Sequence, residues 1–187
     1  MSNAAPVRVL AGLVVLVGAP ASGKTSFVRA LVAQRRIDAE SVVSSDEIRA
    51  ELSGDPLAEA GSDAVDARIF DERDRRIVAR LAAGRTAVAE STNVTPQARA
   101  RLLAIARRFD VPVTMLRFTD DVTDLLQQHV ERGRPDVTAT DVRTYAAIMT
   151  RDASADQLRS EGAAAVHDVP GRRQGVTPDE AAEGFSF

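Results

Sequence analysis

The sequence predicts an α/β fold in which a parallel β-sheet is flanked by helices on both faces. Short runs rich in valine, leucine and alanine alternate along the 187 residues with longer segments whose apolar residues recur at helical spacing. That alternation is typical of β–α–β units. A chain of this length also suffices for one domain with a full hydrophobic core.

The first β–α unit contains the most informative segment. Residues 12–18 are predicted to form a buried strand and residues 24–35 a helix. Between them, Gly18-Ala19-Pro20-Ala21-Ser22-Gly23-Lys24-Thr25 fits the pattern G-x-x-x-x-G-K-[ST]. A strand, a glycine-containing turn and a helix form the context that a phosphate-binding loop requires. The sequence therefore predicts a P-loop NTPase fold and a nucleotide-binding site.

Lys24 is the only lysine among the 24 lysine and arginine residues. A compact ammonium fits between phosphate oxygens, whereas a planar guanidinium is bulkier. We expect Lys24 to reach the β- and γ-phosphate oxygens and the Thr25 hydroxyl to hold Mg²⁺, while backbone N–H groups bind the phosphates. The predicted nucleotide-binding residues are Gly18, Ala19, Pro20, Ala21, Ser22, Gly23, Lys24, Thr25 and Ser26, with Arg132 and Arg134 from a later segment.

The rest of the chain continues the alternation of strands and helices. Further strands are predicted at 41–45, 86–90, 112–118 and 163–168, and further helices at 46–53, 63–83, 96–109, 121–131 and 138–150, with one or two more turns near 154–161. Residues 12–170 are predicted to form a single domain with a small helical lid at about 128–150. We expect residues 1–11 to be a disordered leader and residues 171–187 to be a loose tail, since 171–184 are polar and lack an apolar period.

Composition excludes several classes of function. The chain has no cysteine, which rules out disulfides, thiol catalysis and Cys-ligated zinc. Arg8 and the apolar stretch after it could pass for a secretory signal, but cleavage after Ala19-Pro20-Ala21 would cut the phosphate loop. The stretch is also shorter than the ~20 residues of a membrane span. We therefore expect a cytoplasmic protein with no membrane partner. The net charge of −3 gives no global attraction to nucleic acid.

A second segment, from Val42 to Arg49, carries candidate catalytic residues. A strand is predicted to end at Ser44 or Ser45 and a helix to begin at Asp46, at the sheet edge where α/β folds bind ligands. Asp46 and Arg49 share a helical face. Asp46 could accept a proton from an attacking hydroxyl, and Arg49 could hold an anionic acceptor. The alternative is a helix start with a serine N-cap, Glu47 in a capping box and an Asp46–Arg49 surface pair.

Arg132-Gly133-Arg134-Pro135 lies between two predicted helices and is interpreted as a lid. Arginines from such a lid can neutralise the charge that develops on a transferring phosphoryl group. Arg134 is the preferred catalytic candidate because Pro135 fixes the backbone directly after it. A basic helix–helix loop without a catalytic role is the alternative.

Together these motifs resemble a known family. The phosphate loop, the Ser44-Ser45-Asp46-x-x-Arg49 segment, and Thr92-Asn93 followed by Ala98-Arg99 look like the P-loop kinases typified by the kinase domain of bacterial and phage polynucleotide 5′-kinases, over residues 12–168. The resemblance implies ATP as donor, Mg²⁺ as cofactor, Asp46 as general base and Arg49 on the acceptor phosphate. The implied catalytic residues are Lys24, Asp46, Arg49 and Arg134, and the implied acceptor-binding residues are Asp46, Arg49, Thr92, Asn93 and Arg99.

Two positions depart from that family. The family usually has an aspartate before its Thr-Asn, where this chain has Glu90 and Ser91, so the role of Glu90 in magnesium binding is left open. The family lid usually has an arginine one or two turns before the Arg-x-Arg, where this chain has Gln128. Stabilisation of the donor phosphates would then rest on fewer arginines.

The predicted function is an ATP-dependent phosphotransferase that acts on a polynucleotide 5′-hydroxyl. Two alternatives remain: a kinase for a small molecule such as an antibiotic, sugar or nucleotide, and a non-catalytic ATP-binding switch. A regulatory GTPase is disfavoured because its N-K-x-D motif would need a second lysine. An adenylate-kinase-like enzyme is disfavoured because the chain lacks the G-x-P-R segment of that group.

Overall fold

The computed structural model describes residues 5–54 and 62–187. Its centre is a parallel sheet with the strand order β3-β4-β2-β5-β6. The strands are β2 (Leu13–Val17), β3 (Val42–Ser44), β4 (Ala87–Glu90), β5 (Val113–Arg117) and β6 (Ala165–Asp168). All five strands predicted from the sequence are confirmed, and each lies within its predicted range.

Seven predicted helical segments are also confirmed. They are α1 (Lys24–Ala33), α2 (Ser45–Leu52), α3 (Ser62–Ala82), α4 (Pro96–Arg108), α5 (Val122–Arg132), α6 (Ala139–Asp152) and α7 (Ala155–Glu161). A short 3-10 turn, η1 (Ala39–Ser41), leads into β3. No helix of the described residues is long and apolar enough to cross a membrane.

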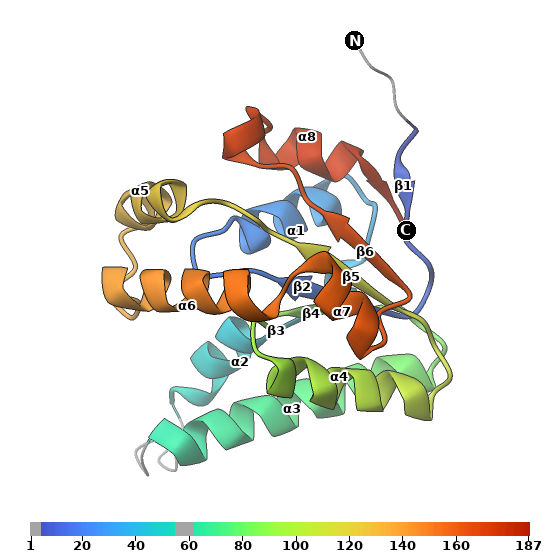
Figure 1. Ribbon diagram of the computed structural model, residues 1–187. Coiled ribbons are helices and arrows are strands. Elements are labelled where there is room, and N and C mark those ends of the chain that lie inside the picture. The colour runs from blue at the N-terminus through green and yellow to red at the C-terminus, as the bar shows by residue number, and fades with distance from the viewer. Residues whose placement is uncertain (1–4, 55–61) are drawn as a thin grey trace.

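The two faces of the sheet bury separate apolar cores. Leu13, Val15 and Val17 of β2 point to one face, where residues of α3, α4 and α7 cover them. The alternate residues Val14 and Leu16 point to the other face and pack against α1. Figure 1 shows α3 and α4 on one side of the sheet and α1 on the other. A central parallel strand is buried on both faces, which explains its uninterrupted apolar sequence.

Both chain ends correct the sequence prediction. Residues 7–8 were assigned to a disordered leader, but they form β1 (Val7–Arg8), which pairs in parallel with β7 (Phe185–Ser186). The expected loose tail contains a 3-10 turn, η3 (Arg172–Gln174), and a helix, α8 (Pro178–Glu183), that packs on α1. These elements are too short to show an apolar period, so the polar composition of residues 171–184 was misleading. Residues 1–4 lie outside the described residues.

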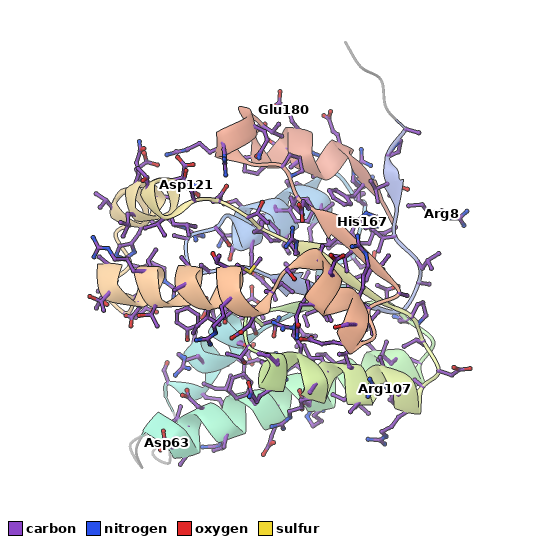
Figure 2. The ribbon with its side chains drawn as sticks, in the orientation of Figure 1. Arg8, Asp63, Arg107, Asp121, His167 and Glu180 are labelled. Atoms are coloured by element: carbon purple, nitrogen blue, oxygen red, sulfur yellow. The ribbon has the colours of Figure 1, made fainter. Side chains whose placement is uncertain are left out.

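Helices α5 and α6 form a hairpin at one end of the sheet, where the sequence predicted a lid (Figure 1). Asp121, labelled in Figure 2, caps α5 by accepting a hydrogen bond from the Asp124 backbone N–H. Gly133 ends the same helix at φ +60°, a conformation that glycine adopts without strain. Leu125 of α5 and Val142 of α6 are buried together in a separate small apolar cluster. The same cluster includes Ala19 of the phosphate loop, so the hairpin packs against that loop.

Candidate active site

The phosphate loop leaves β2 and enters α1 at Lys24. The buried Lys24 ammonium turns back into the loop, where its Nζ donates to the carbonyl oxygens of Gly18 at 2.8 Å and Ala19 at 2.7 Å. Gly18 is required here because a Cβ at this position would lie 2.7 Å from the Ser22 hydroxyl and 2.9 Å from Phe118. The Gly18 N–H also donates to the Thr92 carbonyl at 2.9 Å. The loop is therefore folded around the lysine and tied to the end of β4.

Burial lowers the pKa of Lys24 to about 8. The negative charges of Glu90 and Asp46 oppose that shift, while the positive charges of Arg132 and Arg134 add to it. Four charged side chains from β4, α2 and the lid thus act on the same ammonium. An anion that replaced the loop carbonyls as the partner of Lys24 would favour its charged form.

Glu90, whose role in magnesium binding the sequence left open, contacts the phosphate loop. It lies at the end of β4, beside β2 in the sheet, and its carboxylate accepts a hydrogen bond of 2.5 Å from the Thr25 hydroxyl. Burial raises the pKa of Glu90, although this bond and the charge of Lys24 oppose the shift.

The Thr25 hydroxyl and the Glu90 carboxylate offer the hard oxygen atoms that Mg²⁺ prefers. The described residues contain no group of three or more acidic, histidine or cysteine side chains that could hold a metal ion. Mg²⁺ in nucleotide sites commonly takes one or two protein oxygens and completes its coordination with phosphates and water. The pair at Thr25 therefore fits a phosphate-linked Mg²⁺.

Asp46 faces the lid. Its carboxylate accepts a 3.0 Å hydrogen bond from Arg134, whose other nitrogens bind Asp136. Asp46 lies in the first turn of α2, and the N-cap of that helix is Ser44, which accepts from the Glu47 N–H at 3.4 Å. The side chain of Asp46 remains 63% exposed, so solvent or an acceptor can reach it.

Arg49 lies on the same helix as Asp46 but has a different partner. Its guanidinium donates to Asp66 of α3 at 2.6 Å, with both side chains about half exposed. A simple helix start would predict a surface pair between Asp46 and Arg49. Instead, Asp46 pairs with Arg134 and Arg49 pairs with Asp66. Arg49 also acts electrostatically on Asp136, the residue that binds Arg134. Arg49 and the lid therefore approach each other at the open end of the sheet.

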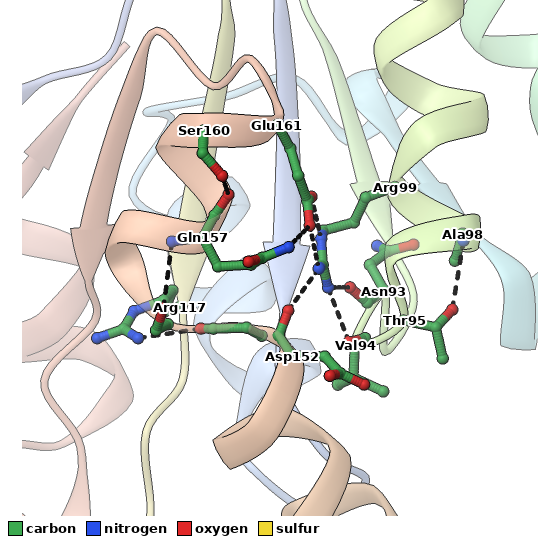
Figure 3. Close-up of polar contacts among 12 residues, drawn as sticks. Asn93, Val94, Thr95, Ala98, Arg99, Arg117, Asp152, Gln157, Ser160 and Glu161 are labelled. Atoms are coloured by element: carbon green, nitrogen blue, oxygen red, sulfur yellow. Dashed lines mark hydrogen bonds and ion pairs between the residues drawn. The ribbon is translucent and has the colours of Figure 1, made fainter.

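Arg99 requires a correction. The sequence placed it among the acceptor-binding residues, but its side chain is 0% exposed and forms an ion pair with Glu161 at 2.7 Å. Its remaining nitrogens donate to the carbonyl oxygens of Asn93, Val94 and Asp152. Figure 3 shows these contacts joining the start of α4 to α7 and the end of α6. Every part of the guanidinium is engaged, so Arg99 holds helices together.

Asn93 also has a structural role. Its amide nitrogen donates to the Leu16 carbonyl of β2 at 2.9 Å, and the residue is 2% exposed. Its backbone adopts φ +48°, which asparagine tolerates better than most residues. Of the proposed acceptor residues, Asp46 and Arg49 are thus the two with exposed side chains, while Asn93 and the Thr92 backbone support the loop.

A cavity of about 450 Å³ adjoins the phosphate loop. It is lined by Ser22, Gly23 and Ser26 at the phosphate loop, by the apolar rings of Phe27 and Phe118, and by residues of α5 that include Gln128 and Arg132. The opposite wall is the C-terminal segment from Val169 to Pro178. Its volume lies in the ~300–1,000 Å³ range of small-molecule sites. Sequence analysis missed this wall, because residues 171–184 are polar and lack an apolar period.

Comparisons with known proteins agree with this architecture. A family model described as an AAA domain matches residues 13–158. No curated protein matches the chain. One solved structure with a similar fold is that of the Pnkp1/Rnl/Hen1 RNA repair complex, with a TM-score of 0.64 and 20% identity over 80% of this chain. This chain spans 46% of that longer chain.

Two further structures resemble the chain over nearly its whole length. A putative kinase from Chloroflexus aurantiacus J-10-fl has a TM-score of 0.63 and 16% identity, covering 92% of this chain and 95% of its own. A gluconokinase from Sinorhizobium meliloti 1021 has a TM-score of 0.57 and 15% identity, covering 92% of this chain and 91% of its own. At these identities the likeness establishes the fold, which is the P-loop fold that the sequence predicted.

Proposed function

Because the chain belongs to the AAA domain family, we propose that it is an ATP-dependent kinase that transfers the γ-phosphoryl group to an acceptor hydroxyl, specifically the 5′-hydroxyl of a polynucleotide. One observation carries the kinase assignment. Charged side chains from three different parts of the chain act electrostatically on the single lysine of the phosphate loop. They are Glu90, Asp46, Arg132 and Arg134. Such a cluster suits a reaction between a bound triphosphate and a hydroxyl.

In this proposal each site residue has a defined role in phosphoryl transfer. The loop N–H groups and Lys24 bind the donor phosphates, while Thr25 and Glu90 hold Mg²⁺ at the donor. When bound, Mg²⁺ neutralises charge on the phosphate oxygens. Asp46 accepts the proton of the acceptor hydroxyl, whose oxygen forms a bond to the γ-phosphorus as the bond to the β,γ-bridging oxygen breaks and ADP leaves. Arg134 neutralises the charge on the transferring group, and it must leave Asp46 to do so.

The nucleic-acid acceptor is supported by Arg49 and by the motifs shared with polynucleotide kinases. A half-exposed arginine one helical turn from Asp46 can hold a phosphate next to the reacting hydroxyl. A nucleoside 3′-phosphate is the smallest ligand that offers both groups. A small-molecule acceptor is the second candidate, because the fold matches a gluconokinase over more than nine-tenths of both chains.

Phosphate transfer from labelled ATP tests the assignment. The acceptors are a 5′-hydroxyl oligonucleotide, a nucleoside 3′-phosphate, an uncharged nucleoside, gluconate and shikimate, all at low salt. We expect transfer to the first two and little to the uncharged nucleoside. Efficient transfer to a small molecule without transfer to the oligonucleotide would replace the polynucleotide assignment, and ATP binding without transfer to any acceptor would favour a switch protein.

Arg49→Ala tests the acceptor site separately. Loss of a charge-assisted contact to the acceptor phosphate should raise the acceptor KM and leave ATP affinity unchanged. The acceptor KM of the wild type should also rise with salt, since the contact is electrostatic. Arg75→Ala is the matched control, because Arg75 is an exposed arginine of α3 that is paired with Glu72. Equal acceptor KM values for wild type and Arg49→Ala would remove Arg49 from the acceptor site.

A further inference from the structure

The loop that joins α5 to α6 carries an acidic residue, Asp136, that belongs to none of the motifs found in the sequence. It accepts two hydrogen bonds from Arg134, the lid arginine two residues before it. Arg134 Nε donates to Asp136 Oδ1 at 3.0 Å, and Nη2 of the same guanidinium donates to Oδ2. Two parallel hydrogen bonds between a guanidinium and a carboxylate fix the plane of the guanidinium. Asp136 therefore sets the direction of the Arg134 side chain.

The other edge of the Arg134 guanidinium faces the site. Its Nη1, which Asp136 does not use, donates to Asp46 Oδ2 at 3.0 Å across a separation of 88 residues in the chain. Hydrogen bonding to Asp136 is the largest of the effects that raise the pKa of Arg134 above its usual value, and Asp46 adds to it. Arg134 is thus held by two bonds within the lid loop and by a single bond across the site. The single bond is the one that a phosphoryl group can replace.

Positive charge surrounds the Asp136 carboxylate. The hydrogen bond from Arg134 is the largest cause that lowers the pKa of Asp136, and the positive charge of Arg49 on α2 lowers it further. Asp136 therefore stays ionised at neutral pH. About half of the Asp136 side chain and 37% of the Arg134 side chain are exposed, so the pair contributes little to stability. Removal of the Asp136 carboxylate should leave the fold intact.

We propose that Asp136 is a positioning residue for phosphoryl transfer, which holds the Arg134 guanidinium by one edge while Nη1 moves from Asp46 to the transferring group. Without such an anchor, a long side chain that left Asp46 would rotate freely in solvent, and the cost of ordering it again would be added to the barrier. In this role Asp136 contacts neither the donor nor the acceptor. The inference rests on the proposed function, because it requires Asp46 as the base and Arg134 on the phosphoryl group.

Steady-state transfer from labelled MgATP measures this role, with whichever of the acceptors named above the wild type phosphorylates fastest. Asp136→Ala should lower kcat about tenfold, because Arg134 is no longer directed at the group in transfer. The acceptor KM should not rise, since Asp136 is an anion near Arg49 and holds no acceptor group. Asp156→Ala is the matched control. Asp156 also pairs with a nearby arginine, Arg159 at 3.1 Å, but it lies on α7, and this variant should have the wild-type kcat.

A double-mutant cycle separates positioning from direct action. Arg134→Ala should lose more kcat than Asp136→Ala, because it removes the group that neutralises the phosphoryl charge. If Asp136 acts through Arg134, the double variant Arg134→Ala/Asp136→Ala should have the same kcat as Arg134→Ala alone. A role in stability alone would leave kcat unchanged in the folded protein, so the cycle detects a coupling that a purely structural role does not give.

Each other outcome has a definite meaning. An unchanged kcat in Asp136→Ala, with a wild-type melting curve as folding control, overturns the positioning role and leaves the kinase proposal intact. Losses of kcat that multiply in the double variant show that Asp136 acts independently of Arg134 and also overturn it. A raised acceptor KM with unchanged kcat places Asp136 in the acceptor site and overturns it as well. If the wild type transfers phosphate to no acceptor, the proposed function itself fails, and the role of Asp136 fails with it.

Discussion

Lys24 shows how burial of a single residue can set the pH range of a binding site. Its pKa of about 8 means that the unbound ammonium begins to lose its proton well below the usual range for lysine. Donor phosphates favour the charged form, and they are already ionised above pH 7 because their second pKa is about 6. ATP affinity should therefore be constant below pH 8 and fall above it, by up to about tenfold per pH unit.

The measurement is the dissociation constant of MgATP at pH 7, 8 and 9. Lys24→Ala is the control: it should bind more weakly and show little dependence on pH over this range. A wild-type constant that does not change between pH 7 and 9 would show that the ammonium does not contact the phosphates.

Asp46 is the residue on which transfer should depend most. Asp46→Asn should bind MgATP about as well as the wild type and lose ~10²–10⁴ in kcat, because a general base acts on the acceptor in the transition state. Ser44 is the N-cap of α2, so the substitution should cost little stability. Single-turnover rates and ATP titration measure the two effects. A kcat close to that of the wild type would mean that Asp46 serves only as a partner of Arg134.

Arg49 and Arg99 show the limit of sequence reasoning at this scale. Both arginines belong to segments that resemble family motifs. Nothing in the local sequence shows that the Arg49 guanidinium is exposed and the Arg99 guanidinium is buried. The partners of Arg99 are Glu161 and the Asp152 carbonyl, 62 and 53 residues away, so its burial depends on how α6 and α7 pack. Glu90 was visible in the sequence, but its bond to Thr25 requires β4 to lie beside β2.

At the scale of elements, those with an apolar run or a helical period were predictable, whereas β1 and β7, which pair across the chain ends, were not. Strand β2 consists of five consecutive apolar residues, and helices α1 to α7 contain enough residues to show a helical period. By contrast, η3 contains three residues, and β1 and β7 contain two residues each and are held by pairing between opposite ends of the chain. No local pattern can reveal such a pairing.

The junction of α4, α6 and α7 depends on Arg99. Arg99→Ala should destabilise the protein by about 3–5 kcal/mol, because it leaves Glu161 and three carbonyl oxygens without their buried partner. Denaturant unfolding measures that loss. Well below the melting temperature, the acceptor KM should equal the wild-type value, since Arg99 does not reach the site. A raised acceptor KM with unchanged stability would restore the acceptor-binding role predicted from the sequence.

At the scale of the whole molecule, the two ends of the chain and the cavity beside the phosphate loop share one apolar core. The ring of Phe27 packs edge to face on Phe185 of β7 and on Phe118, with centroid distances of 5.5 and 5.6 Å. Phe27 and Phe118 also line the cavity. A change at Phe185, which contacts Phe27 without lining the cavity, should therefore affect the binding of a nucleotide there.

Phe185→Ala should cost about 3–5 kcal/mol of stability and also weaken ATP binding, because the cavity it leaves frees the ring of Phe27. Leu158→Ala is the matched control, since Leu158 is fully buried in the core on the opposite face of the sheet. It should lose about 2–5 kcal/mol and keep wild-type ATP affinity. Both variants are compared by denaturant unfolding and by ATP titration under conditions where each remains folded. If the two variants bind ATP equally well, the C-terminal strand stabilises the fold without shaping the donor site, and the coupling between the chain ends and the cavity is excluded.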